Sequence, residues 1–140
     1  MLQLVHHCAR RSLCVRAAAS GDVWIERVSA SAGVYRMGAT TALAESLGGI
    51  GFVDVPTAGG GGDLLLPGRP FAMVEGPCGM RTLESPVTGF VVASNTSLVD
   101  DDPAQAGGGA QDTAASWIVE VEMESGDVSD EFEPLPAAET

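Results

Sequence analysis

The thiol of Cys78 is the side chain that this sequence presents most openly for chemistry, because it stands at a sharp break in an apolar stretch. Residues 71–86 read F-A-M-V-E-G-P-C-G-M-R-T-L-E-S-P. This pattern predicts two strands joined by a tight turn, with proline at the second turn position and glycine at the fourth. Cys78 is then displayed at a hairpin tip, with Glu75 and Arg81 as the nearest charges on the two arms.

A displayed thiol reacts efficiently only when its thiolate is stabilised. Around Cys78, the carboxylates of Glu75 and Glu84 disfavour a thiolate and only Arg81 favours one. A catalytic cysteine also needs a base, usually histidine, and both histidines of the chain lie within its first ten residues. We interpret Cys78 as an exposed thiol without catalytic activity. Glu75 is interpreted as a solvated charge, with a docking contact as the alternative.

Composition excludes several classes of function. Cys8, Cys14 and Cys78 form no CxxC pair and no zinc spacing, so neither a disulfide framework nor a metal site is predicted. All seven basic residues are arginines, against 19 acidic residues, and the net charge is -12. So acidic a chain lacks the clustered bases that bind phosphate backbones, and nucleic acid is not an expected partner. The absence of lysine removes every side-chain ε-amine from covalent chemistry.

Residues 1–20 differ from the rest of the chain, because they contain three arginines and no acidic residue. This composition is typical of a mitochondrial or plastid transit peptide and lacks the uninterrupted apolar core of a secretory signal. We therefore expect the protein in the mitochondrial matrix. The alternative is a disordered N-terminal segment without a targeting role. No later run approaches the roughly 20 apolar residues of a membrane-spanning helix, so no membrane association is expected.

Short apolar runs separated by glycine and proline follow this leader. They predict strands over 23–28, 33–38, 50–56, 71–75, 80–84, 85–95 (which begins with a turn) and 117–123. One short helix is expected between the second and third strands, capped by Thr40 or Thr41 and ended by Gly48. Glycine-rich residues 57–63 and 100–112 are interpreted as flexible loops. Many short strands with regular turns predict a small β-barrel or sandwich.

The predicted organisation has three parts: the transit peptide at 1–20, one domain at 21–125, and an acidic tail at 126–140. The tail contains prolines and many acids, which predicts a frayed helix or disorder. Trp24 and Trp117 are expected to pack in the core or on strands rather than to line a ligand site.

Several motifs in the predicted domain occur in the order found in a known family. Residues 38–56 read G-A-T-T-A-L-A-E-S-L-G-G-I-G-F-V-D-V-P, which matches G-I-T-x-x-A-x-x-x-L-G-x-I-x-F-V-x-L-P without a gap. Glu75 matches the glutamate of an E-S-V-K-A tip, and residues 85–89 match an S-P-V-S-G turn. Asn95 and Trp117 match V-N-x-x-L and G-W-L. From about residue 24 to 121, the chain therefore resembles the glycine cleavage system H proteins, relatives of the lipoyl and biotinyl carrier domains.

This resemblance implies a mainly β fold, a small barrel-sandwich hybrid with one or two short helices. It also implies a non-catalytic carrier that holds lipoate on a lysine at the hairpin tip. The implied partners are the pyridoxal-phosphate glycine decarboxylase, the folate-dependent aminomethyltransferase and the dihydrolipoyl dehydrogenase. Glu75 and Arg81 are the implied partner contacts, because they flank the tip.

The tip departs from the family pattern, since the lysine lies three residues after the glutamate and that position is Cys78. A thioester to its sulfur is labile, and Arg81 is a poor nucleophile because its guanidinium stays protonated. We therefore expect no cofactor on this chain. The resulting hypothesis is an H-protein-like subunit that competes with, scaffolds or regulates a true carrier. The alternatives are a carrier fold recruited as a structural or regulatory subunit of another mitochondrial complex, and a redox adaptor working through Cys78.

Overall fold

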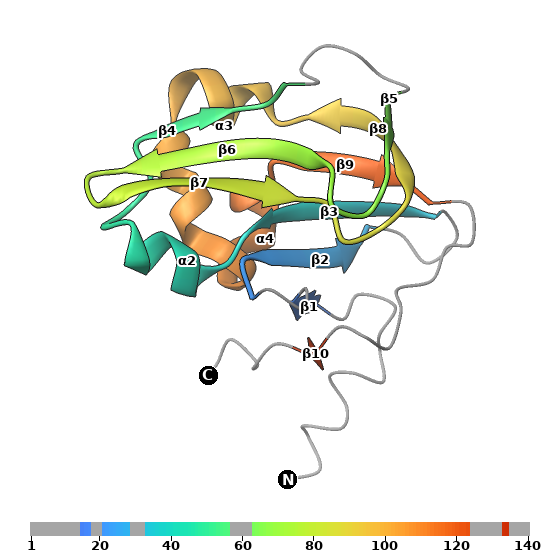
Figure 1. Ribbon diagram of the computed structural model, residues 1–140, viewed down its shortest axis with the longest axis horizontal. Helices are drawn as coiled ribbons and strands as arrows, with labels where there is room; N and C mark the ends of the chain where they lie inside the picture. Colours follow the sequence, from blue (N-terminus) through green and yellow to red (C-terminus); the bar gives the residue numbers. More distant parts are fainter. Residues whose placement is uncertain (1–14, 18–20, 29–32, 57–62, 124–132, 135–140) are drawn as a thin grey trace, which may run out of the picture.

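The computed structural model describes residues 15–17, 21–28, 33–56, 63–123 and 133–134 (Figure 1). Residues 57–62, which form most of the first predicted loop, lie outside these described residues. So do most residues of the predicted leader and tail. Within the described residues, no helix is long and apolar enough to cross a membrane.

The described strands form two antiparallel sheets that pack face to face (Figure 1). The larger sheet contains, in spatial order, β10 (Glu133–Pro134), β1 (Val15–Ala17), β2 (Val23–Arg27), β3 (Val34–Ala39), β9 (Val119–Glu122), β8 (Gly89–Ser94) and β5 (Asp63–Leu65). The smaller sheet contains β4 (Phe52–Asp54), β6 (Pro70–Gly76) and β7 (Gly79–Glu84). The predicted mainly β fold with short helices is confirmed.

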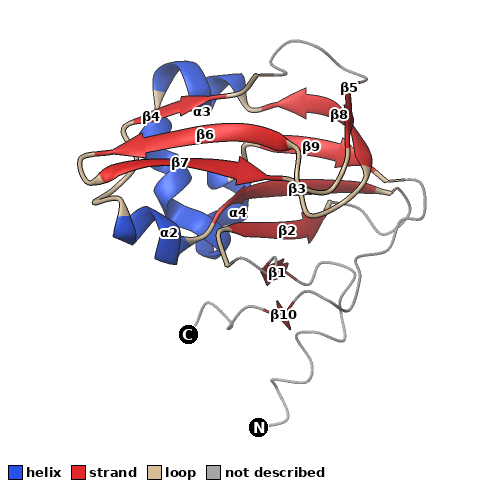
Figure 2. Cartoon of the chain, in the orientation of Figure 1, coloured by secondary structure: helices blue, strands red, loops and turns tan. Residues whose placement is uncertain are grey.

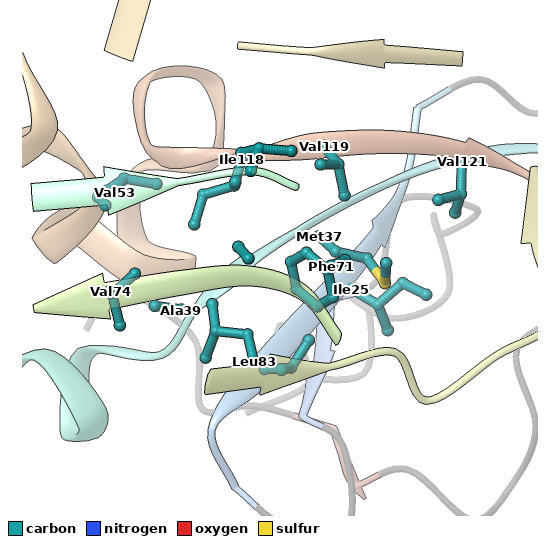
Figure 3. Packing of buried hydrophobic residues seen from close by; sticks show 14 of the residues in the cluster. Ile25, Met37, Ala39, Val53, Phe71, Val74, Leu83, Ile118, Val119 and Val121 are labelled. Atoms are coloured by element: carbon teal, nitrogen blue, oxygen red, sulfur yellow. The ribbon is translucent and has the colours of Figure 1, made fainter. Parts of the chain in front are cut away.

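The core lies between the two sheets, where apolar residues of the strands face inward, and the alternation of buried and exposed residues is clearest in β8 and β9. In β9 the two valines are fully buried while Glu120 and Glu122 face outward, as the alternating sequence predicts. Figure 3 shows side chains of the two sheets meeting, among them Ile25, Met37 and Val121 from the larger sheet and Phe71, Val74 and Leu83 from the smaller one. Burial of these side chains is the main driving force for holding the sheets together.

The predicted short helix is α2 (Thr41–Ser46), and it begins and ends at residues that the sequence predicts. The Thr40 hydroxyl accepts a hydrogen bond from the backbone N–H of Leu43 at 3.3 Å and donates one to the Gly21 carbonyl at 2.7 Å. Thr40 is therefore the N-cap, one of the two candidates. Gly48 follows the helix with φ of 77°, a left-handed conformation that favours glycine.

The interpretation of residues 100–112 as a flexible loop is wrong. They belong to α3 (Thr96–Asp101) and to η1 (Pro103–Asp112), a 3-10 segment that leads into α4 (Thr113–Ser116). Figure 2 shows these helices gathered at one end of the sheets with α2. The segment contains glycines because it packs tightly: Gly109 has a φ of 59°, and a Cβ there would collide with Thr41. The glycines allow close packing, and Ser116 fixes the segment by donating to the Gly109 carbonyl at 2.6 Å.

Parts of the predicted leader and tail also take part in the larger sheet. Strand β1 lies within residues 1–20, and it pairs with β2 on one side and with β10 on the other. The pairing of β10 differs from the frayed helix or disorder expected for residues 126–140. The sequence gives little signal for this strand, because it contains two residues and one of them is proline.

A row of charged side chains crosses the outer face of the larger sheet. Glu26 on β2 pairs in register with Arg36 on β3, which in turn pairs with Glu120 on β9. The Arg36 Nε donates to Glu120 Oε2 at 2.9 Å, and its guanidinium lies 4.9 Å from the ring centroid of Trp117. Trp24, in contrast, is fully buried. Both tryptophans therefore pack against strands, as predicted.

Burial raises the pKa of Glu26, and a hydrogen bond from Thr113 and the charge of Arg36 only partly oppose this. The folded state thus holds the proton more tightly than the unfolded chain does. The stability that this gives is present at low pH and is lost as pH rises through the folded pKa. We expect Glu26→Gln to raise the free energy of unfolding at about pH 7 and to change it little at about pH 4, measured by urea denaturation.

Glu120→Gln is the matched control, because it removes the other carboxylate on Arg36. It should lower the free energy of unfolding at neutral pH by up to about 1 kcal/mol, since it only breaks a partly exposed ion pair. Equal destabilisation by both substitutions would show that attraction to Arg36, and not burial, dominates at Glu26.

Gly109→Ala tests whether the glycine-rich segment is packed. The added Cβ meets the backbone of Thr41 and the left-handed φ disfavours alanine, so the free energy of unfolding should fall by about 2 to 3 kcal/mol. Gly68→Ala is the control, because its φ is 89° but no atom lies within 4 Å of the added Cβ. It should cost only about 1 kcal/mol. Equal losses in urea denaturation would contradict tight packing at Gly109.

Candidate functional site

The predicted hairpin is formed by β6 and β7, and its tip lies at one end of the molecule (Figure 1). Gly76 pairs with Gly79 as the last pair of the ladder, which leaves Pro77 and Cys78 at the turn. Gly79 has a φ of 147°, which favours glycine there. The Cys78 side chain is exposed. The structure therefore confirms the displayed position that the sequence predicts.

The tip is held against the connection between α2 and β4. The backbone N–H of Cys78 donates to the Leu47 carbonyl at 2.9 Å, and the Gly51 N–H donates to the Glu75 carbonyl at 2.8 Å. Between these two bonds lies Gly76, where a Cβ would collide with the carbonyl oxygens of Leu47 and Gly49. Glycine is needed at Gly76 because the two backbone segments approach so closely. The tip is consequently a fixed platform with an exposed side chain.

The sulfur of Cys78 lies beside this connection. A Cβ built on Gly48 would stand 3.1 Å from Sγ, so the two groups are in close contact. Among the described residues, no group of three or more His, Cys, Asp or Glu side chains could hold a metal ion. What Cys78 offers is an exposed thiol on a rigid turn, without a neighbouring imidazole in the described structure.

Glu75 lies on the outer face of the smaller sheet, one strand position before the tip. It stands between Phe52 on β4 and Met80 on β7, which are its register partners. All three side chains are exposed. Its carboxylate is thus accessible to water or to a docking protein, and two apolar side chains flank it.

Arg81 is engaged within the chain. Its Nη1 donates to Asp22 Oδ2 at 2.9 Å, which connects β7 to the residue before β2. The structure therefore separates Arg81 from Glu75, although the sequence places both beside the tip. Reasoning from the sequence missed Asp22, because the pair spans 59 positions and no local pattern marks it.

A shallow groove runs beside the tip, between α2, the connection to β4 and η1. It is lined by Thr41, Ala44, Glu45, Gly48, Gly49, Ile50, Gly51, Pro77, Ala104 and Gly107. Most of these residues are small. The sequence features that mark this groove are Gly48, Gly49, Gly51 and Gly107. Composition alone does not distinguish such closely packed glycines from those of a flexible loop.

Gly76→Ala tests the attachment of the tip. The added Cβ cannot fit against the carbonyl oxygens of Leu47 and Gly49, so the tip must move and the free energy of unfolding should fall by about 2 to 3 kcal/mol. Gly51→Ala is the matched control, because its nearest contact is 3.9 Å away. It should change stability by less than about 0.5 kcal/mol. Thermal and urea denaturation report both variants, and equal stability of the two would contradict the close approach.

Comparison with solved structures supports the architecture. A crystal structure of a glycine cleavage system H protein from Mycobacterium marinum is similar to this chain with a TM-score of 0.67 and 26% sequence identity. The similarity covers 86% of this chain and 89% of that protein. The predicted fold class is thus the fold of a solved H protein.

Sequence comparison gives the same family. The H protein of Listeria monocytogenes serotype 4b is 34% identical over 116 residues, which cover 79% of this chain and 88% of that protein. A probable H protein of Natronomonas pharaonis is 32% identical over 112 residues, 76% of each chain. The family model described as "Glycine cleavage H-protein" matches residues 17–139. Proteins of this family are non-enzymatic, lipoate-bearing carriers of the glycine cleavage system, and this chain belongs to the glycine cleavage H-protein family.

Proposed function

We propose that this chain is an H-protein-like, non-catalytic subunit of mitochondrial glycine cleavage that docks with the system's enzymes but carries no lipoate. The observation that carries the proposal is the thiol of Cys78 at the tip. The E-S-V-K-A motif of the family reads E-G-P-C-G here, and the whole chain contains no lysine. An amide to lipoate needs a primary amine at this turn, and none is present.

Neighbouring residues offer no substitute for that amine. Arg81, three positions after Cys78, forms an ion pair with Asp22, and its guanidinium is a poor nucleophile because it stays protonated. A thioester on Cys78 would be labile to water and to other thiols. The empty tip therefore follows from the side chains present, whatever lipoylating enzyme the cell contains.

The docking role rests on what the chain retains. The hairpin is displayed and fixed by backbone hydrogen bonds, and the Glu75 carboxylate is exposed beside its tip. Glycine decarboxylase, aminomethyltransferase and dihydrolipoyl dehydrogenase are the proposed partners, because components of this system are the partners of the family. A chain that presents the same tip without the arm occupies their docking surfaces unproductively. We infer that it limits access of a lipoyl-bearing H protein.

The mitochondrial location rests on residues 1–20. Three arginines, no acid and interleaved leucine, alanine and serine are the composition of a transit peptide. Import into the matrix would place the chain in the same compartment as the proposed partners.

A reconstituted assay tests the docking role. Glycine-dependent CO₂ release is measured with glycine decarboxylase, aminomethyltransferase, dihydrolipoyl dehydrogenase and a lipoyl-bearing H protein, with the folate acceptor and an electron acceptor that regenerate the oxidised lipoyl group, and this chain is then added. We expect inhibition that more lipoyl-bearing H protein overcomes, because both proteins compete for one surface. This chain alone should support no turnover. Release supported by this chain alone, or no inhibition at a large excess, would contradict the proposal.

Two charge reversals on the same hairpin sharpen this assay. Glu75→Arg places a positive charge beside the tip and should weaken the inhibition roughly fivefold, the effect of about 1 kcal/mol of binding free energy. Glu84→Arg is the matched control, because Glu84, which was expected to lie near Cys78, is exposed on β7 at the end away from the tip. It should leave the inhibition within about a factor of two. Equal weakening by both would mean that overall charge, and not docking at the tip, explains the inhibition.

A further inference from the structure

A pocket with a volume of about 320 Å³ lies where α3, η1 and α4 meet, at the end of the sheets that the helices occupy (Figure 2). Pockets that bind small molecules usually have volumes of roughly 300 to 1,000 Å³. The lining combines the polar Asn95, Asp102 and Gln105 with the apolar Leu98, Ala115 and Trp117. No residue of this lining belongs to the groove beside the hairpin tip. The pocket is therefore a separate feature of the molecule.

Hydrogen bonds from Asn95 hold the two sides of the pocket together. Its Oδ1 accepts from the backbone N–H of Leu98 at 3.4 Å, which caps α3. Its Nδ2 donates to the Trp117 carbonyl at 2.9 Å, and its backbone N–H donates to the Ile118 carbonyl at 2.9 Å. The start of α3 is thus tied to the segment that follows α4, and the pocket is formed before any ligand binds.

The amide donors of the lining are already engaged within the chain. Asn95 Nδ2 donates to Trp117, and Gln105 Nε2 donates to Asp102 Oδ2 at 2.8 Å. Within the described structure, no protein donor bonds to the second carboxylate oxygen of Asp102 or to the side-chain carbonyl of Gln105. Both groups are acceptors. The hydrogen-bonding capacity that remains therefore favours a ligand that donates.

The charges of the lining favour a cation in the same way. Asp102 is its one charged residue, and two more exposed carboxylates, those of Asp100 and Asp101, precede it on α3. Arg36 contacts the ring of Trp117, but its guanidinium is paired with Glu120 at 2.9 Å. An anion would be repelled here, and a neutral ligand would gain no charge-assisted hydrogen bond from Asp102.

We propose that this pocket binds a small primary alkylammonium ion. The ammonium group has three donors, of which two bond to the free oxygens of Asp102 and Gln105. The alkyl chain packs against the apolar part of the lining, formed by Leu98, Ala115 and Trp117. The site shares no residue with the tip, so it is independent of the proposed docking role.

Chemical shifts of backbone amides in the full chain test the site directly, in a titration with n-butylammonium at about pH 7 and constant ionic strength. We expect saturable shifts that centre on residues 95–117. Two ligands of matched size are the controls: n-butanol should bind at least about tenfold more weakly, and butyrate should show no saturable shifts. Equal binding of n-butanol or butyrate, shifts that centre elsewhere, or no saturable shifts with n-butylammonium would overturn the proposal.

Two substitutions on neighbouring carboxylates separate the site from the overall acidity of the chain. Asp102→Asn should weaken n-butylammonium binding at least about tenfold, while its remaining oxygen can still accept from Gln105. Asp101→Asn removes the same charge one position earlier, outside the lining, and should change binding by less than about twofold. Equal weakening by both variants would overturn the proposal, because net charge would then explain the binding.

Gln105→Ala gives a second, independent variant at an exposed position. It removes one of the two proposed acceptors and should weaken n-butylammonium binding about threefold to tenfold. The amide spectrum of each variant without ligand shows whether the fold is retained. Unchanged binding by a folded Gln105→Ala variant would show that the ammonium does not lie between these two side chains.

Discussion

Two backbone hydrogen bonds, from Cys78 to Leu47 and from Gly51 to Glu75, hold the hairpin tip on the connection between α2 and β4. The other features of the site depend on this attachment. It requires glycine at Gly76, because any side chain there would separate the two backbones. It also fixes the turn so that the side chain of Cys78 is exposed and the carboxylate of Glu75 stands beside it. Since the bonds involve main-chain atoms, the display of the tip does not depend on which side chain the tip presents.

The exposure of the residue at the tip therefore does not depend on the reactivity of its side chain. We propose that Cys78 stands at the position where the H-protein family carries its lipoyl group, because it lies three residues after Glu75, which matches the glutamate of the family motif. The one cationic side chain on β7, that of Arg81, is held by Asp22. A chain built in this way keeps the fold of the family and a fixed hairpin tip, while it lacks the amine that attachment of lipoate needs. This separation is the physical basis for the proposed role as a docking subunit without an arm.

Local patterns predicted the parts of the fold that local physics determines. The hairpin, the N-cap at Thr40, the end of α2 at Gly48 and the alternation of β9 all follow from turn geometry, capping or periodicity. Residues 100–112 were predicted wrongly because glycine has two uses that composition does not distinguish. At Gly109 it allows η1 to approach Thr41, a contact between segments far apart in the sequence.

The candidate site shows the same limit of prediction. Cys78 and Glu75 were found because they belong to one hairpin, whereas the partner of Arg81 lies before β2 and has no sequence signal. The need for glycine at Gly76 likewise arises from Leu47 and Gly49, which only the folded chain brings near.

Whether the tip of this H-protein family member carries a lipoyl group can be read from the intact mass of the protein purified from its source. We expect the mass of the unmodified chain after any removal of the N-terminal leader, with Cys78 reacting as a free thiol under reducing conditions. A mass increment that corresponds to a lipoyl group, mapped by fragmentation to the peptide that contains Cys78, would show that the proposed absence of lipoate is wrong.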